Sequence, residues 1–242
     1  MITQAYVGSE LELFSHATCW KSYVARSVVS YLGARVLEVG AGIGTTTAAL
    51  CRQPHEAWIC LEPDATQAGE IRQRKEAGEL PACCEVRVGT LETMDTQERF
   101  DSILYMDVLE HIADDQAECR RAAAHLRPGG HLVILSPAHQ SLFTPFDAAI
   151  GHYRRYSKQS LEGAVPTELQ RVSLRYLDSV GLLASLSNRL FLRQSMPTPR
   201  QIAVWDKCLV RASRLVDPLL MYCLGKSVLG IWRKADTRVK NC

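Results

Sequence analysis

The sequence predicts an α/β domain built on a doubly wound, largely parallel sheet. Five apolar segments, each followed by a turn and a segment of helical character, alternate along the first part of the chain. Parallel strands require crossover connections, so this alternation predicts helices on both faces of the sheet. A turn with Gly40, Gly42 and Gly44 follows the first strand, where the backbone can approach a ligand closely. Ligands of such sheets bind at the carboxyl ends of the strands.

Length and composition suit one globular domain with appendages, since the 242 residues are 47% hydrophobic and 22% charged. The chain lacks a run of 18 apolar residues and a signal peptide, so we expect a cytoplasmic protein. Nine cysteines without a C-x-x-C pair predict reduced thiols and no metal site. Residues 1–170 carry 15 basic and 22 acidic side chains, whereas residues 171–242 carry 13 and 4. The basic part is either a solvated face or a contact for an anionic partner.

Periodicity and turn residues define the expected elements. Apolar residues at helical spacing, ended by Gly33, predict a helix over 9–32. Asp114 and Asp115 favour a helix start, because acids stabilise its positive end, and Ser157 is a helix cap. The predicted strands are 35–40, 57–62, 84–88, 100–107, 131–135, 169–177 and 227–234, and the helices between them are 44–52, 64–78, 114–126 and 157–164.

About fifty residues separate the last two predicted strands. They hold an apolar stretch at 182–192, a segment with two prolines at 196–199 that interrupts helical structure, and a helix that Pro218 ends or kinks. One face of this helix is apolar, and basic residues accompany it: Ile202, Trp205, Leu209, Ala212 and Val216 beside Arg200, Lys207, Arg211 and Arg214. The insertion is therefore either a helical cap over the substrate opening or a contact with a membrane surface or lipid tail.

Glu38, two residues before the glycine turn, decides between two kinds of nucleotide site. A dinucleotide fingerprint needs a third glycine where the sequence has Thr45 or Thr47. A carboxylate beside the turn disfavours a phosphate and suits a cationic ligand. The pattern Glu38-x-Gly40-x-Gly42-x-Gly44 resembles the first motif of the class I S-adenosylmethionine-dependent methyltransferases.

Later segments extend this resemblance over most of the chain. They include Glu62 at the tip of the second strand, D-x-x-E-H at 107–111, L-R-P-G-G at 126–130, and F-D-x-x-x-G-H-x-R-R-Y-S at 146–157. The last motif is typical of one bacterial subgroup of small-molecule methyltransferases. The resemblance implies a Rossmann-like, seven-stranded sheet in the order 3-2-1-4-5-7-6 with strand 7 antiparallel. We therefore expect three parts: a helical segment at 1–33 that either forms a lid or only packs against the domain, a core at 34–178 and 226–236, and a helical cap at 179–225 that could equally be a dimer surface.

The resemblance further implies S-adenosylmethionine as cofactor and S-adenosylhomocysteine as product. Glu62 would accept hydrogen bonds from the ribose hydroxyls; a helix-cap role is the alternative, which Asp64 fills better. His111 either leans over the cofactor or is structural. The expected cofactor-binding residues are Glu38, Gly40, Ala41, Gly42, Gly44, Thr45, Glu62, Pro63, Gly89, Thr90, Leu91, Met106, Asp107, Val108 and His111.

The loop after the fifth strand is long enough to be functional and begins beside the expected methyl group. A hydroxyl acceptor gains from a general base, and the candidates are His139, Asp147 and His152. His139 is preferred because it is nearest the strand end, although each of the three could instead pin the loop. The expected substrate-binding residues are Trp20, Tyr23, Tyr153, Arg154, Arg155 and Tyr156; the two arginines could equally form salt bridges that close the loop.

We therefore expect methyl transfer to a hydroxyl of a sugar, lipid-linked or natural-product molecule. The alternatives are a cofactor-binding pseudo-enzyme or regulatory partner, and methylation of nitrogen or carbon. Nucleic acid is not an expected partner, because the core is acidic and lacks an arginine- and aromatic-rich strand surface. The oligomeric state is open between a monomer and a homodimer.

Overall fold

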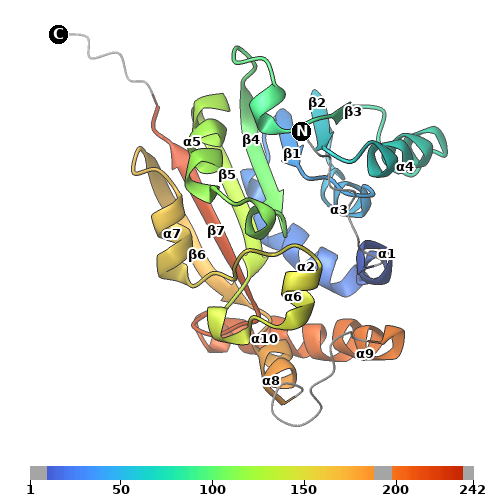
Figure 1. Cartoon of the computed structure of the whole chain (residues 1–242), viewed down its shortest axis with the longest axis vertical. Coiled ribbons are helices and arrows are strands. Elements are labelled where there is room, and N and C mark those ends of the chain that lie inside the picture. Colours follow the sequence, from blue (N-terminus) through green and yellow to red (C-terminus); the bar gives the residue numbers. More distant parts are fainter. Residues whose placement is uncertain (1–9, 188–197, 237–242) are drawn as a thin grey trace.

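The computed structural model describes residues 10–187 and 198–236, which form one seven-stranded sheet with helices on both faces (Figure 1). The strand order is β3-β2-β1-β4-β5-β7-β6. The first five strands in this order pair in parallel, and β7 is antiparallel to both β5 and β6. The predicted fold class, strand order and antiparallel strand are thus confirmed.

The strands are close to their predicted positions: β1 (Arg35–Val39), β2 (Ala57–Glu62), β3 (Cys84–Val88), β4 (Phe100–Met106), β5 (Leu126–Pro137), β6 (Leu169–Leu177) and β7 (Ser227–Lys234). The main helices are α1 (Glu10–Ser15), α2 (Thr18–Val28), α3 (Thr45–Leu50), α4 (Ala65–Glu76), α5 (Asp115–His125), α6 (Pro145–Ala149), α7 (Lys158–Ala164), α8 (Ser179–Ser187), α9 (Pro199–Val204) and α10 (Val210–Leu219). Short turns are η1 (Val29–Tyr31), η2 (Leu91–Thr93), η3 (Leu109–His111), η4 (Gln140–Leu142) and the π-helical η6 (Trp205–Leu209).

Side chains of the strands alternate between two buried cores, as the period of two requires. Ile59 and Leu61 of β2 pack in the core that α5 and α7 cover. Trp58 and Cys60 pack in the other core, beneath α2, α3, α4 and α10. Both faces of the central strands are therefore buried, which explains their near-continuous apolar sequences.

The predicted N-terminal helix is broken, because α1 ends at Ser15 and α2 begins at Thr18. The start of α2 is capped from the distant insertion: Asp206 accepts hydrogen bonds from the backbone amides of Cys19 (3.1 Å) and Trp20 (2.7 Å). Such a long-range cap leaves no local signal, so periodicity alone predicted one helix.

Two other segments also differ from expectation. β5 is longer than the predicted 131–135, because Leu126 already pairs with Phe100 before a bulge in the ladder. The loop after β5, in which the sequence predicted no helix, contains η4 and α6. Thr144 caps α6, and Pro145 occupies its first position.

The insertion between β6 and β7 is helical, as expected, and lies at one end of the sheet (Figure 1). Its predicted single helix is α9, η6 and α10 in continuous succession, with Pro218 in the last turn. The apolar stretch at 182–192 lies only partly in α8; its remainder and residues 196–197 of the two-proline segment are outside the described residues. No helix within 10–187 or 198–236 is both long and apolar enough to cross a membrane.

Candidate active site

The glycine turn after β1 adopts the conformation its sequence predicts. Gly40, Gly42 and Gly44 have φ values of +67°, +57° and +79°, a region that other residues rarely occupy. A Cβ on Gly40 would approach Val108 side-chain atoms to 2.7 Å, so glycine is also required by the contact between the ends of β1 and β4. The turn leads directly into α3, of which Thr45 is the first residue.

Glu38 is buried beneath this turn with a relative exposure of 1%. Its Oε2 atom accepts hydrogen bonds from Thr47 Oγ1 (2.7 Å) and Trp58 Nε1 (2.8 Å). Burial raises the Glu38 pKa to about 7, although both hydrogen bonds favour the charged form. Glu38 therefore ties the turn to α3 and β2. Sequence reasoning missed Thr47 and Trp58, whose only possible signal is one polar atom each in otherwise apolar segments.

Glu62 lies at the end of β2 and joins the second strand to the glycine turn. Its Oε2 accepts the amide of Gly42 (2.7 Å), and its Oε1 accepts the amide of Asp64 (3.0 Å). A carboxylate has about four lone-pair positions, so about two remain, as many as a ribose diol would use. Asp64 itself caps α4 through the amides of Thr66 and Gln67, which leaves Glu62 available as a ligand.

The turn after β3 and the end of β4 complete the expected cofactor site. Thr90 is exposed, whereas the Leu91 side chain is in the core at 1% exposure, so only the Leu91 backbone can line an opening. Asp107 has a φ of +56° and exposes part of its surface to solvent. The protein around its carboxyl group raises the Asp107 pKa to about 6 by desolvation. The other expected residues lie at or just after the ends of β2, β3 and β4. Pro63 is exposed, Met106 and Val108 are half-buried, and Gly89 has a φ of +150°.

Asp147 organises the loop after β5. It is 1% exposed and accepts hydrogen bonds from Arg155 Nε (2.8 Å), His152 Nδ1 (3.0 Å) and both the amide and hydroxyl of Thr144. Burial opposes ionisation, but the bonds from His152 and Arg155 hold the Asp147 pKa well below its usual range. Asp147 therefore remains charged, and it orients His152 rather than receiving a proton itself.

His152 stands among other ionisable groups near the end of β4. Its ring packs edge-on against His111 at a centroid distance of 4.5 Å, and its Nε2 is 4.0 Å from Glu110 Oε1, too far for a hydrogen bond. Burial, and the charge His152 can carry, lower the His111 pKa to about 4. Burial and Asp107 raise the Glu110 pKa well above its usual value.

Glu110, His111 and His152 also bring one potential ligand atom each to within 4.8 Å of the others. Carboxylate and imidazole groups can together hold a divalent ion. The expectation that the chain binds no metal remains a prediction.

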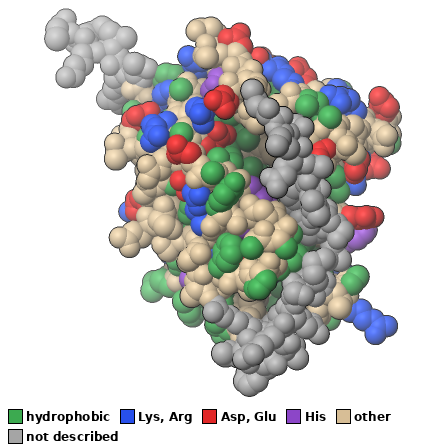
Figure 2. Space-filling model, viewed as in Figure 1, with side chains coloured by type: hydrophobic (Ala, Val, Ile, Leu, Met, Phe, Trp, Pro, Cys, Tyr) green, Lys and Arg blue, Asp and Glu red, His purple; other side chains and the backbone are tan. Residues whose placement is uncertain are grey.

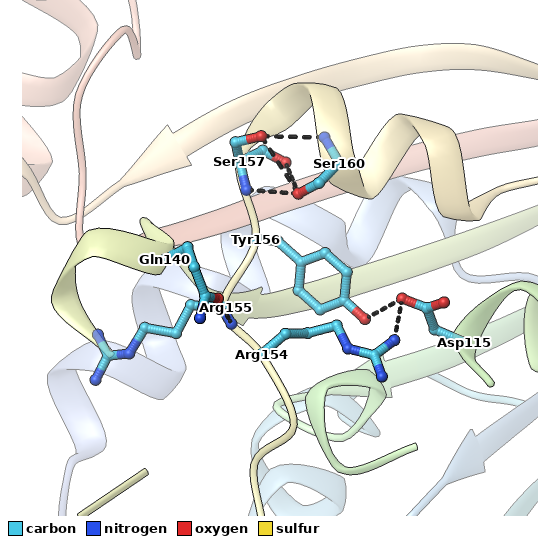
Figure 3. Close-up of a pocket in the computed structure, with 7 residues that line it drawn as sticks. All are labelled: Asp115, Gln140, Arg154, Arg155, Tyr156, Ser157 and Ser160. Carbon is cyan, nitrogen blue, oxygen red and sulfur yellow. Dashed lines mark hydrogen bonds and ion pairs between the residues drawn. The ribbon is translucent and has the colours of Figure 1, made fainter. Parts of the chain in front are cut away.

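Arg154 and Arg155 are both paired with acids of this chain, and their side chains point in different directions (Figure 3). Arg154 bonds Asp115 at 2.7 Å and the carbonyl of Ala113, and Tyr156 donates its hydroxyl to the same Asp115 carboxylate (2.8 Å). These residues border a surface depression of about 350 Å³ together with Gln140, Ser157 and Ser160. Tyr153 is 60% exposed.

His139 lies just beyond the end of β5, with a φ of +66°. Its Nε2 is 2.9 Å from the Gly225 carbonyl, which can only accept, so Nε2 carries the proton and Nδ1 holds the lone pair. The ring stacks on Tyr176 at 4.8 Å. His139 thus connects the loop after β5 to the segment before β7 through a neutral backbone carbonyl.

Helix α2 and the insertion form one helical layer, joined by buried carboxylates. Tyr23 donates to Asp217 (2.7 Å), and Trp20 packs on Trp205 at a centroid distance of 5.8 Å. The indole of Trp205 donates to Asp178 (2.7 Å). The Tyr23 hydroxyl is therefore already hydrogen-bonded within the protein. Of the two expected substrate-binding aromatics on α2, Trp20 is the partly exposed one.

Lys226, a residue that sequence reasoning missed, precedes β7 and faces the same region. Its Nζ lies 4.8 Å from the centre of the Trp205 ring. Burial lowers its pKa, while the negative charges of Asp178, Asp107 and Asp147 act in the opposite direction. Its position between two predicted strands gave no sequence signal.

Comparison with known proteins finds methyltransferases similar to part of this chain. Residues 37–132 match the family model described as "Methyltransferase domain". Curated relatives named ubiquinone biosynthesis O-methyltransferase include one from Bradyrhizobium sp. (strain ORS 278), 34% identical over 110 residues, and one from Nitrobacter winogradskyi, 36% identical over 121 residues. These alignments cover 46% and 50% of this chain and 42% and 45% of the relatives, so the chain spans less than half the length of the curated relatives it matches.

Solved structures extend the similarity of fold across the whole chain. A geranyl diphosphate methyltransferase in complex with S-adenosylmethionine has a TM-score of 0.63 at 15% identity, covering 96% of this chain and 92% of that one. The N-methyltransferase NodS from Bradyrhizobium japonicum WM9, with S-adenosylhomocysteine, has a TM-score of 0.55 at 16% identity, with coverages of 88% and 83%.

The family match covers residues 37–132, and the sheet order of the described residues agrees with the fold of the similar solved structures. This part of the chain therefore resembles a class I S-adenosylmethionine-dependent methyltransferase domain. S-adenosylmethionine is the cofactor of that class, and the two remaining acceptor positions of Glu62 fit its ribose.

Proposed function

We propose that this protein transfers a methyl group from S-adenosylmethionine to a hydroxyl of a small molecule of sugar, lipid-linked or natural-product type that carries an apolar part. The relatives named O-methyltransferases support oxygen as the methylated atom. Half-buried Phe143, Phe146 and Ile150 in the loop after β5 support an apolar part in the acceptor. Hydrophobic side chains gather over this part of the molecule in Figure 2.

The observation that carries the proposal is the Asp147–His152 pair. Asp147 holds the Nδ1 proton of His152, so the lone pair of this histidine is on Nε2. His152 can then accept the proton of a hydroxyl at Nε2, while the Asp147 charge stabilises the imidazolium that forms. Arg155 keeps Asp147 ionised through its paired hydrogen bonds.

The cofactor supplies an electrophilic methyl group on a sulfonium, and the chain supplies position and proton acceptance. Glu62 and the glycine turn hold the donor, and in-line placement of the acceptor provides much of the rate. Among the three predicted candidates, His152 is the proposed base, because a carboxylate orients it. His139, whose partner is a neutral carbonyl, positions the loop.

The test is a methyl-transfer assay with a phenol or catechol acceptor and its amine and thiol analogues. We expect transfer to the hydroxyl compound, and a fall in kcat of about 10²- to 10⁴-fold in His152→Gln. His16→Gln is the matched control, because His16 is exposed at the break between α1 and α2. Transfer to the amine alone, or full activity of His152→Gln, would contradict the proposal. Binding of S-adenosylhomocysteine without transfer to any acceptor would favour the pseudo-enzyme.

We also propose that the helical insertion contacts an anionic membrane surface, from which a lipid-linked acceptor would be delivered. Leu215 and Leu219, one turn apart on α10, are 75% and 82% exposed, and Met221 is 78% exposed. Arg211 precedes them on the same stripe of the helix. Exposed apolar side chains beside basic ones suit an interfacial helix.

Sedimentation with vesicles distinguishes this contact from a solvated cap. We expect the full chain to sediment with anionic vesicles but not with neutral ones. Leu219→Asp should release it, whereas Val172→Asp on β6, at a position 46% exposed, should not. Equal binding of both variants would refute the membrane contact.

A further inference from the structure

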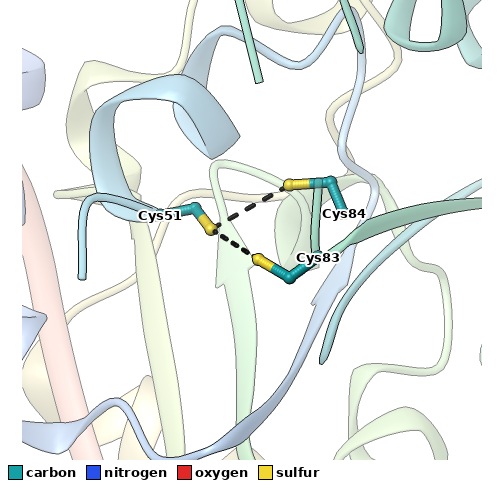
Figure 4. Close-up of side chains that lie close together, drawn as sticks. All are labelled: Cys51, Cys83 and Cys84. Atoms are coloured by element: carbon teal, nitrogen blue, oxygen red, sulfur yellow. Dashed lines mark hydrogen bonds between the residues drawn. The ribbon is translucent and has the colours of Figure 1, made fainter. Parts of the chain in front are cut away.

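A cluster of three thiols lies at the amino ends of the strands, away from the cofactor site. Cys51 Sγ is 3.8 Å from Cys83 Sγ and 3.9 Å from Cys84 Sγ, and all three sulfur atoms are within 4.8 Å of one another (Figure 4). Cys84 begins β3, whereas the cofactor-facing end of that strand is Val88. Four residues of strand separate the two ends by about 13 Å.

The backbone fixes the position of each of these cysteines. Cys51 is the C-cap of α3, with its amide bonded to the Thr47 carbonyl. The Cys83 carbonyl accepts the amide of Trp58 on β2 (2.9 Å), and the Cys84 amide bonds the Pro81 carbonyl (3.0 Å). The three sulfur atoms are therefore held together by the helix end and the sheet, without needing a mobile segment.

The sulfur spacing fits metal coordination. Ligands about 2.3 Å from a shared metal lie about 3.8 Å apart in a tetrahedral site and about 4.0 Å apart in a trigonal one. The observed separations of 3.8 and 3.9 Å match these values, whereas a disulfide would require about 2.0 Å. Cys51 and Cys84 are buried and Cys83 is half-buried, so an ion could enter from the Cys83 side.

We propose that Cys51, Cys83 and Cys84 form a site for one thiophilic d¹⁰ ion, zinc or copper(I). Thiolates select such ions over magnesium or calcium. Three thiol protons leave for solvent as the three thiolates bind, and no oxidant takes part. Lys75 lies near enough to Cys84 to offset part of the remaining negative charge. The bound ion joins the end of α3 to the start of β3.

The experiment uses the full chain, reduced and stripped of metal, titrated with zinc or copper(I) against a chromophoric chelator. We expect one ion per chain by native mass spectrometry. Cobalt(II), a spectroscopic substitute for zinc, should give a thiolate charge-transfer band. The two titrations decide which ion is held more tightly. Ion binding should also raise the melting temperature, because only the folded chain holds Cys51 beside Cys83 and Cys84 and so binds the ion more tightly than the unfolded chain.

Cys83→Ser is the main variant, because its half-buried side chain makes it the mildest change in the cluster. We expect it to weaken binding at least about 100-fold, as loss of a ligand exceeds the effect of a second-shell change. Cys51→Ala should do the same. Cys208→Ser and Cys223→Ser are controls, because both cysteines are exposed and outside the cluster, and they should bind as wild type. Circular dichroism of each variant verifies its fold.

Three results would overturn the proposal. The first is that the wild-type chain binds neither zinc nor copper(I) at micromolar concentration. The second is that a folded Cys83→Ser variant binds the ion as tightly as the wild-type chain does. Finally, the untreated chain could have a mass two hydrogens lower and no metal, which would identify a disulfide instead. Because the readouts are stoichiometry and melting temperature, they are independent of methyl transfer.

Discussion

Replacing Glu62 by glutamine tests how the chain holds its cofactor. Each oxygen of Glu62 accepts one backbone amide, from Gly42 at 2.7 Å and from Asp64 at 3.0 Å. In the glutamine variant, the side-chain NH2 group replaces one oxygen and therefore faces a backbone N–H that it cannot accept. The side chain is also neutral, so its bond with a ribose hydroxyl is no longer assisted by charge. Hydrogen bonds to charged groups contribute about 1.5–3 kcal/mol each. A loss of about 2–3 kcal/mol corresponds to an affinity about 30- to 150-fold lower for S-adenosylhomocysteine.

Calorimetry with S-adenosylhomocysteine measures this loss. Glu79→Gln is the matched control, because Glu79 is exposed and pairs only with Arg74 at the surface. Glu62→Asp, which keeps the charge but withdraws it by one methylene, should have an intermediate affinity. A folded Glu62→Gln protein that binds within threefold of wild type would refute the role of this carboxylate.

Three further changes test other parts of the structure. Glu38→Gln should flatten the pH dependence of unfolding: its pKa of about 7, against 4.5 unperturbed, means the folded state keeps a proton that the unfolded chain releases. The Glu38 contribution to wild-type stability should therefore fall by about 3 kcal/mol as pH rises from below 4.5 to above 7, and parallel urea-unfolding profiles of wild type and variant would contradict this. Asp217→Asn should destabilise the chain by about 2–4 kcal/mol and expose the helical layer to protease; an unchanged urea midpoint would disprove it. Asparagine keeps one acceptor oxygen, but its NH2 group must oppose the donors that bonded the other oxygen, either those of Tyr23 and Asp178 or those of Ser179. His152→Gln should lower kcat with little change in KM, and a rise in KM alone would indicate a binding role instead.

The sheet could be predicted because its signals are local. Apolar runs that end in a glycine or an acid gave β1 and β2 within a residue of their observed ends. The resemblance in the glycine turn gave the order of the strands. These features depend on residues close together in sequence, so one pattern was enough.

The contacts that organise the site could not be predicted, because they join residues far apart in sequence. Asp206 caps α2 from 186 and 187 positions away, and Trp58 reaches Glu38 from the next strand. Each of these contacts is made by a polar group in a helix or strand whose sequence pattern is otherwise amphipathic or apolar. Their partners become evident only when the sheet and the insertion are in place.

In the loop after β5, the sequence predicted which residues are present at the site but not how they contact one another. The sequence predicted a functional loop and named Asp147, His152 and Arg155 within it. It did not predict that Asp147 would bind both of the others, because three charged residues a few positions apart have many possible arrangements. We propose His152 rather than the nearer His139 as the base, because His152 bonds the Asp147 carboxylate whereas His139 bonds the Gly225 carbonyl.

The most direct test of the central claim is calorimetry of the wild-type chain with S-adenosylhomocysteine, repeated with NADH. The glycine turn, buried Glu38 and the two open acceptor positions of Glu62 predict micromolar binding of the first compound and none of the second. Binding of NADH, or no binding of S-adenosylhomocysteine by the folded chain, would contradict the account of the cofactor site.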